Sequence, residues 1–214
     1  MSVLITRPFH DVGTRYLSSW SQRLIDLAQK KGKKVIDLKG EKANKVELTG
    51  RIKKLNPSLV ILNGHGDSDL VTGHDNKTLV KLGENESILK SRITYAVSCR
   101  SAKLLGSSCA KDQKTTYIGY DDDFIFTQNS VFINRPMQDL RAKPFMEASN
   151  QVVISLLKGH KAFDASSRSR NMFKAAYRKL LTSTSDPDSL LDAKCLRWDY
   201  AQQVCLGDGE ATVK

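Results

Sequence analysis

An unbroken apolar run, Leu59–Val60–Ile61–Leu62, constrains the fold of this chain more than any other feature. A run of this kind is typical of a strand that is buried on both faces of a sheet. Further strands are expected at residues 3–5, 35–38, 93–97 and 116–120, and helical spacing of apolar residues places helices at 16–28, 46–55 and 102–110. Strands that alternate with helices predict an α/β fold with a mostly parallel sheet.

The rest of the chain has a different pattern. Residues 70–92 are polar with two short apolar pairs, and they predict a hairpin or short arms. The later segments predict helices at 152–157 and 172–181 and a surface loop at 182–189. Residues 196–200 and 203–206 predict either a closing strand pair or a terminal helix followed by one strand. We expect one domain over residues 1–214, with the sheet core and catalytic loops in 1–130 and the helical part and closing strand in 131–214.

Composition bears on compartment and partners. Of the 214 residues, 40% are hydrophobic and 27% are charged, which is typical of a globular protein. The sequence has neither the roughly 18 consecutive apolar residues of a membrane helix nor a signal-peptide pattern, so we expect a cytoplasmic protein without a membrane partner. The four cysteines include no Cys-x-x-Cys pair and are expected to be free thiols.

The net charge of +11 favours an anionic partner such as nucleic acid. Its distribution weakens that interpretation, because residues 61–130 carry eight basic and nine acidic residues. The sequence also lacks a nucleic-acid-binding motif, so nucleic acid is not expected to be the primary ligand.

Two loops that follow predicted strands carry side chains suited to catalysis. Asn63–Gly64–His65–Gly66–Asp67 follows strand 59–62, and Ser98–Cys99–Arg100–Ser101 follows strand 93–97. The carboxyl ends of parallel strands meet at one edge of a sheet, so His65 and Cys99 are expected to face each other. Taken alone, the histidine would more often be a turn residue and the cysteine a small buried hydrophobe. Together they predict a nucleophilic Cys–His pair.

The chemistry of such a pair requires these residue types. A cysteine thiol is mostly protonated at neutral pH, so His65 would act as the base that activates Cys99 and as the acid that protonates the leaving amine. The backbone N–H groups of Gly66 and Cys99 are expected to form the oxyanion hole. A helix that starts just after Cys99 would favour the thiolate through its dipole.

The order of these motifs resembles that of the caspase-type cysteine peptidases, the group that contains caspases, gingipains, legumain, clostripain, metacaspases and separase. The resemblance lies in strand–Asn–Gly–His65–Gly, strand–Ser–Cys99–Arg–Ser–Ala, Tyr117–Ile–Gly–Tyr120, and the ending Gln203–Val–Cys–Leu–Gly–Asp208. It implies a three-layer caspase-like sandwich with helices on both faces of the sheet. It also implies a His65–Cys99 dyad that hydrolyses peptide bonds without a cofactor and without an obligatory third carboxylate.

Substrate preference is predicted from charge, because Val97 stands two residues before Cys99, where metacaspases and clostripain have an aspartate. Acidic residues near the predicted site suit a guanidinium or ammonium group and predict cleavage after Arg or Lys. They are Asp67, Asp69, Asp121, Asp122 and Asp123. Alternatively, 121–123 is a solvated turn or a weak calcium site. No metal site is predicted from His65, His74, Cys99 and Cys109, because they lack the short paired spacing of zinc ligands.

Two functions follow from these patterns. The first is a cysteine endopeptidase that acts on a protein or peptide substrate. The second is a caspase-like interaction module that is catalytically silent or is activated by a protein partner. The reactivity of Cys99 distinguishes the two.

Overall fold

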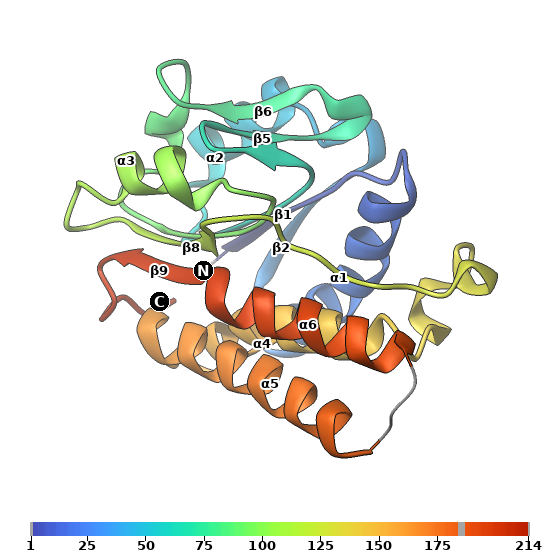
Figure 1. Cartoon of the computed structure of the whole chain (residues 1–214). Coiled ribbons are helices and arrows are strands. Elements are labelled where there is room, and N and C mark those ends of the chain that lie inside the picture. Colours follow the sequence, from blue (N-terminus) through green and yellow to red (C-terminus); the bar gives the residue numbers. More distant parts are fainter. Residues whose placement is uncertain (1, 184–186, 214) are drawn as a thin grey trace.

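The computed structural model describes residues 2–183 and 187–213, which form an α/β fold in three layers (Figure 1). The central sheet has six strands in the order β2-β1-β3-β7-β8-β9. The first five are parallel, and β9 runs antiparallel to β8. The six strands are β1 (Ser2–Arg7), β2 (Lys34–Lys39), β3 (Leu59–Asn63), β7 (Ile93–Val97), β8 (Thr116–Tyr120) and β9 (Gln203–Gly207).

Helices cover both faces of this sheet. One layer contains α1 (Val12–Lys30), α4 (Lys143–Leu157), α5 (Ala162–Ser183) and α6 (Pro187–Gln202), of which α4, α5 and α6 lie below the sheet in Figure 1. The opposite layer contains α2 (Lys45–Leu55), a short π-helix at Ala102–Gly106, and α3 (Ser107–Cys109). A small antiparallel sheet, β4 (Gly66–Asp67), β5 (Leu70–Thr72) and β6 (Thr78–Lys81), packs beside α2 in this second layer.

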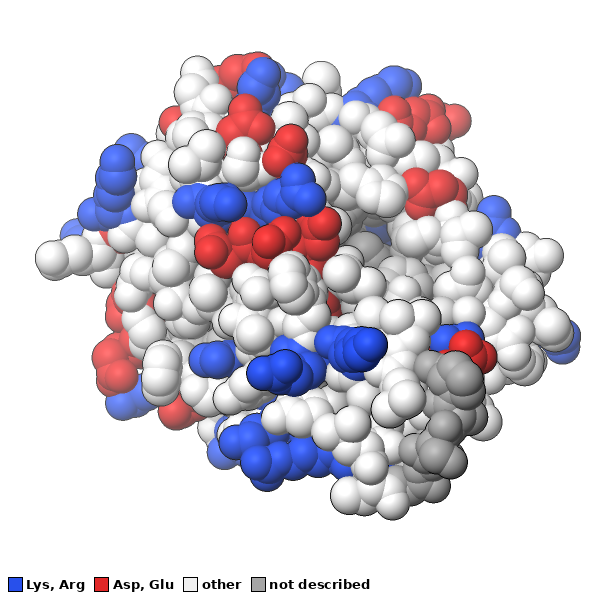
Figure 2. Space-filling view, in the orientation of Figure 1, with Lys and Arg blue, Asp and Glu red and all other residues white. Residues whose placement is uncertain are grey.

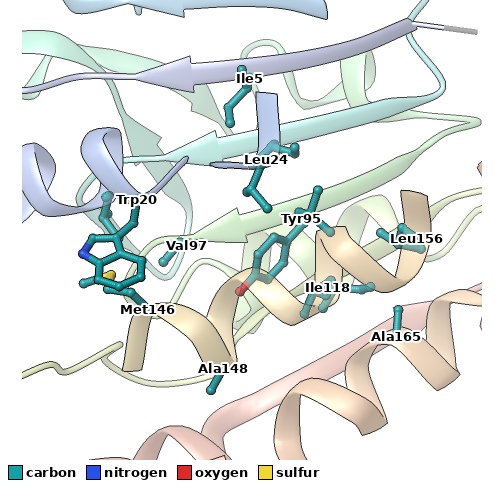
Figure 3. Packing of buried hydrophobic residues seen from close by; sticks show 14 of the residues in the cluster. Ile5, Trp20, Leu24, Tyr95, Val97, Ile118, Met146, Ala148, Leu156 and Ala165 are labelled. Carbon is teal, nitrogen blue, oxygen red and sulfur yellow. The ribbon is translucent and has the colours of Figure 1, made fainter. Parts of the chain in front are cut away.

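The central strand β3 is apolar from Leu59 to Leu62 because it contributes side chains to two cores. Successive residues of a strand point to opposite faces, so Leu59 and Ile61 belong to the core under α1, α4 and α5. Val60 and Leu62 belong to the core under α2 and the small sheet. Figure 3 shows the first core, in which Tyr95, Val97 and Ile118 from the sheet lie close to residues of the helices. The prediction of an α/β fold with a mostly parallel sheet and helices on both faces is confirmed.

Three local predictions need correction. The helix expected at 102–110 is a π-helix followed by a single α-helical turn, because the Gly106 N–H donates to the Ser101 carbonyl five residues back. Residues 196–200 lie in α6, so the terminal-helix alternative is correct and only β9 closes the sheet. The loop expected at 182–189 is shorter, because α5 ends at Ser183 and α6 begins at Pro187, while residues 184–186 lie outside the described residues.

The hairpin or short arms expected at 70–92 are the antiparallel pair of β5 and β6, followed by the 3-10 turn Glu86–Leu89. Residues 121–142 contain only two short 3-10 turns before α4 begins, and they run across the carboxyl end of the sheet. Within the described ranges, no helix combines the length and the apolar character needed to cross a membrane.

Candidate active site

The loop after β3 carries His65 between two glycines that pack tightly against neighbouring backbone. A Cβ atom on Gly64 would lie 2.0 Å from the carbonyl oxygen of Thr72, and one on Gly66 would lie 2.0 Å from Oγ of Ser98. Neither position has room for a side chain. The two glycines therefore let β5 and the loop after β7 approach the backbone of His65 closely.

Cys99 follows β7, the strand that pairs with β3 in the sheet. The adjacent Ser98 hydroxyl donates a hydrogen bond of 2.9 Å to the carbonyl oxygen of His65, so the two loops are joined directly. His65 and Cys99 line the same cavity of about 80 Å³. Its wall is largely apolar and includes Leu17, Val97, Phe124 and Phe126. The structure thus brings the predicted base and the predicted nucleophile to one small cavity.

A carboxylate that the sequence prediction did not include lies against His65. Asp11 is the N-cap of α1, and its Oδ1 accepts from the Thr14 N–H at 2.8 Å. Its Oδ2 lies 2.5 Å from Nε2 of His65. Burial works to raise the pKa of Asp11, but hydrogen bonds from Thr14 and His65 outweigh it and lower the pKa to about 2. The carboxylate is therefore charged at neutral pH and fixes the orientation of the imidazole.

The surroundings of Cys99 favour the protonated thiol over the thiolate. Burial raises the pKa of the Cys99 thiol, and the charge of Asp123 adds to the rise, against opposing contributions from Phe124 and Arg100. Sγ lies 3.8 Å from the carbonyl oxygen of Phe124, which it contacts as a donor. A helical segment does follow Cys99, as a π-helix and one further turn, and the stabilisation of the thiolate by its dipole stays a prediction. An attack by Cys99 therefore requires transfer of its proton to a base.

The predicted acidic residues occupy two places. Asp67 and Asp122 line a cavity of about 350 Å³ together with Lys103 and with Arg100, which follows Cys99 in the sequence. Asp123 also pairs with Arg100, at 2.9 Å. Asp69 and Asp121 are not among the residues that line this cavity.

Figure 2 shows the same mixture of charges, since acidic atoms near the centre of this face lie directly beside basic ones. Basic atoms dominate the lower part of the view, over α5 and α6. A basic substrate side chain would therefore have to compete with Arg100 for the carboxylates of Asp122 and Asp123.

His10 and Asp11 are the site residues that sequence reasoning missed. They follow β1, which ends at the same edge of the sheet as β3 and β7. The rule that identified His65 and Cys99 applies to them equally. The predicted strand, however, ends at residue 5, whereas β1 ends at Arg7, so the sequence pattern does not place His10 and Asp11 in the loop at this edge.

No family model matches the sequence, and no curated protein matches it at a significant level. The functional argument therefore depends on the site.

Proposed function

We propose that this protein is a cysteine endopeptidase in which Cys99 is the nucleophile and His65 the general base. The observation that carries the proposal is the cavity that both residues line at the carboxyl ends of adjacent strands, with their loops joined by the Ser98 hydrogen bond. The resemblance of the two loops to those of caspase-type peptidases supports the same chemistry.

Each residue has a distinct role in the proposed reaction. His65 takes the proton from Cys99 as Sγ attacks the carbonyl carbon of the substrate, and the tetrahedral oxyanion is stabilised by the N–H groups of Gly66 and Cys99. The imidazolium gives its proton to the departing amine, which leaves a thioester on Cys99. Water, activated by His65, then hydrolyses the thioester and restores the thiol. Asp11 holds the imidazole and stabilises its charged form between these steps.

The direct test is hydrolysis of a library of fluorogenic peptides by the wild type and by Cys99→Ala, with and without calcium. Activity should fall by at least about 10³-fold in Cys99→Ala, since removal of a nucleophile abolishes covalent catalysis. Cys195→Ala is the matched control, because Cys195 is also a partly exposed free thiol and lies on α6. Equal activity of the wild type and Cys99→Ala would refute the peptidase proposal.

We infer a preference for Arg or Lys before the cleaved bond. Asp67 and Asp122 line one cavity beside the loop of Cys99, and paired carboxylates bind guanidinium groups through charge-assisted hydrogen bonds. Arg100 already pairs with Asp122 and Asp123, so Arg100→Gln should lower the KM for such peptides. Activity confined to peptides with acidic or small residues at this position would contradict the inference.

The state of Cys99 favours a second candidate function, a silent or partner-activated module. Its thiol has a raised pKa and contacts the Phe124 carbonyl, as in a latent site. Labelling with a peptide that carries a thiol-reactive group distinguishes the two. A peptidase labels at Cys99 much faster than at Cys195, whereas a silent module labels both at ordinary thiol rates.

The free cysteines fit a reducing compartment, and we infer a cytoplasmic location.

A further inference from the structure

Three of the four histidines of the chain gather beside the proposed active site. His10 comes from the loop after β1, His65 from the loop after β3, and His74 from the turn after β5. The ring centroid of His10 lies 6.0 Å from that of His65 and 5.3 Å from that of His74. Segments far apart in the sequence thus bring three imidazoles together, and the proposed peptidase mechanism uses only one of them.

The Asp11 carboxylate lies between two of these rings. Its Oδ2 is 2.5 Å from Nε2 of His65 and 3.3 Å from Nε2 of His10. Because Oδ1 is held by the Thr14 N–H, Oδ2 is the oxygen that faces the two imidazoles. One ligand atom from each of His10, Asp11 and His65 lies within 4.8 Å of the other two. In tetrahedral coordination of Zn²⁺ by nitrogen and oxygen, neighbouring ligand atoms are about 3.3 Å apart, so small side-chain adjustments complete the geometry.

The surroundings of His10 are those of a metal ligand. Its side chain is only 12% exposed, and Nε2 also lies 3.1 Å from Oδ1 of Asn76, a contact that fixes the ring. Nδ1 of His10 and Nδ1 of His74 are buried and have no hydrogen-bond partner among the described residues. Because Asn76 holds Nε2 of His10, the unpartnered Nδ1 of this ring is the nitrogen that is free to accept an ion. His65 is 49% exposed and Asp11 37% exposed, so an ion has a path from solvent.

We propose that His10, Asp11 and His65 bind one divalent transition-metal ion of the Zn²⁺ type, and that the ion switches off the peptidase. Imidazole nitrogen and carboxylate oxygen are the donors that Zn²⁺ accepts, and three protein ligands leave one position for water. The bound ion occupies Nε2 of His65 and separates Asp11 from the imidazole. The His65 ring then no longer has the carboxylate that orients it. The positive charge of the ion also opposes protonation of this ring. The inhibitory part rests on the proposed peptidase function, whereas the binding part does not.

The binding part is tested on the full chain after treatment with a chelator, by calorimetric titration with Zn²⁺ and by the visible absorption of Co²⁺. The wild type is expected to bind one ion. His10→Ala and Asp11→Asn should each weaken Zn²⁺ binding at least tenfold, and Asn in place of Asp11 preserves the N-cap of α1. His160→Ala is the matched control, because this histidine lies between α4 and α5, and it should bind Zn²⁺ like the wild type.

Two further variants decide where the ion lies. His74→Ala should bind Zn²⁺ within about threefold of the wild type, and so should Cys99→Ala. The proposal is overturned if Zn²⁺ binds to His10→Ala and Asp11→Asn as tightly as to the wild type. It is also overturned if His74→Ala loses binding and Asp11→Asn does not, because the ion would then lie on the second group, His10, His74 and Asp75. Loss of binding in Cys99→Ala would assign the ion to the thiol.

The inhibitory part is measured as the ratio of peptide hydrolysis in saturating Zn²⁺ to hydrolysis in chelator, each variant being compared with itself. The ratio should be below one tenth for the wild type and for His160→Ala. For His10→Ala at the same Zn²⁺ concentration, the ratio should be at least ten times higher than for the wild type. An active wild type that binds Zn²⁺ at these residues without losing activity would refute the inhibition. A wild type that binds Zn²⁺ but hydrolyses no peptide would refute the peptidase function and leave the metal site standing.

Discussion

The Ser98 hydroxyl and the His65 carbonyl oxygen, 2.9 Å apart, are the direct link between the loop of the proposed nucleophile and the loop of the proposed base. Ser98 is 1% exposed, so this bond is shielded from water. The His65 carbonyl also accepts from the Thr72 N–H at 2.8 Å, and the loop is thereby held from β5 as well. Catalysis by a Cys–His pair depends on the relative position of these loops.

Replacing Ser98 by alanine should affect activity more than stability. The His65 carbonyl keeps its bond from Thr72, so the loss of one hydrogen bond should lower the free energy of unfolding by only about 1 kcal/mol. The loops lose their direct link, and kcat/KM for peptide hydrolysis should fall by about tenfold or more. Ser169→Ala is the control, because this buried serine donates to the Ala148 carbonyl away from the site. A similar loss of activity in Ser169→Ala would show that Ser98 has no special role.

Gly66→Ala should be strongly destabilising. The new Cβ would lie 2.0 Å from Ser98 Oγ, 2.8 Å from the Cys99 carbonyl oxygen and 2.9 Å from the Leu70 carbonyl oxygen, and two of these three atoms are backbone. Such overpacking should lower the free energy of unfolding by about 3 kcal/mol in urea denaturation. Gly50→Ala, in the middle of α2 with nothing within 4 Å of its Cβ, should instead raise it by about 0.5–1 kcal/mol. If Gly66→Ala unfolded at the same urea concentration as the wild type, the close packing of the two loops would be contradicted.

Asp123→Asn should make Cys99 more reactive. The charge of Asp123 contributes to the raised pKa of the Cys99 thiol, and Asp123 also neutralises Arg100, whose charge opposes the rise. Removing the carboxylate therefore lowers the thiol pKa through both contacts. Alkylation of Cys99 by iodoacetamide at pH 7, followed by peptide mapping, should be a few times faster in this variant, and less so at high salt.

Asp121→Asn is the control for this prediction, because Asp121 does not contribute to the pKa shift of Cys99. In Asp121→Asn, iodoacetamide should alkylate Cys99 at the same rate as in the wild type. A slower reaction in Asp123→Asn would mean that the mutation alters the loop around Phe124 and not only the charge.

The sheet and the placement of His65 and Cys99 at one cavity were predictable from sequence because both follow from local patterns. The apolar run at Leu59 to Leu62 marks a strand buried on two faces, and parallel strands bring the residues after their carboxyl ends to one edge. The glycines on both sides of His65 favour a close approach of backbone to a substrate, whereas the structure shows that they make room for Thr72 and Ser98 of the same chain.

The remainder of the site depends on contacts between distant residues. Thr6 and Arg7 are polar and did not extend the predicted first strand, yet both are buried. Thr6 exchanges hydrogen bonds with Asn63, and Arg7 pairs with Asp37, and neither partner is evident from local sequence. Because the predicted strand ends two residues before β1 does, the sequence pattern does not identify Asp11 as a residue of the site. The state of Cys99 likewise depends on residues 121–126, which have no periodic pattern.

Two aspartates on α6 have opposite surroundings, and one of them anchors the segment beside Cys99. Asp199 is completely buried, and its Oδ1 accepts from the Ile125 N–H at 3.0 Å. Its Oδ2 has no hydrogen-bond partner within the described part of the chain. Burial raises the pKa of Asp199 well above its ordinary value. Asp192, also buried, instead pairs with Arg141 at 2.9 Å.

Asp199→Asn should therefore stabilise the protein increasingly as pH rises. In the unfolded chain Asp199 loses its proton near pH 4, whereas the folded protein retains it to higher pH, so its contribution to stability is present at low pH and is lost as pH rises toward the folded pKa. Asparagine keeps the oxygen that accepts from Ile125 and stays neutral, so this loss does not occur. The difference in melting temperature between the variant and the wild type should grow from pH 4 to pH 8, with about 2–4 °C for each kcal/mol. Asp192→Asn, which breaks the ion pair with Arg141, should lower the melting temperature at pH 7. A difference for Asp199→Asn that does not change with pH would show that this carboxyl group has the same pKa in the folded and unfolded chains.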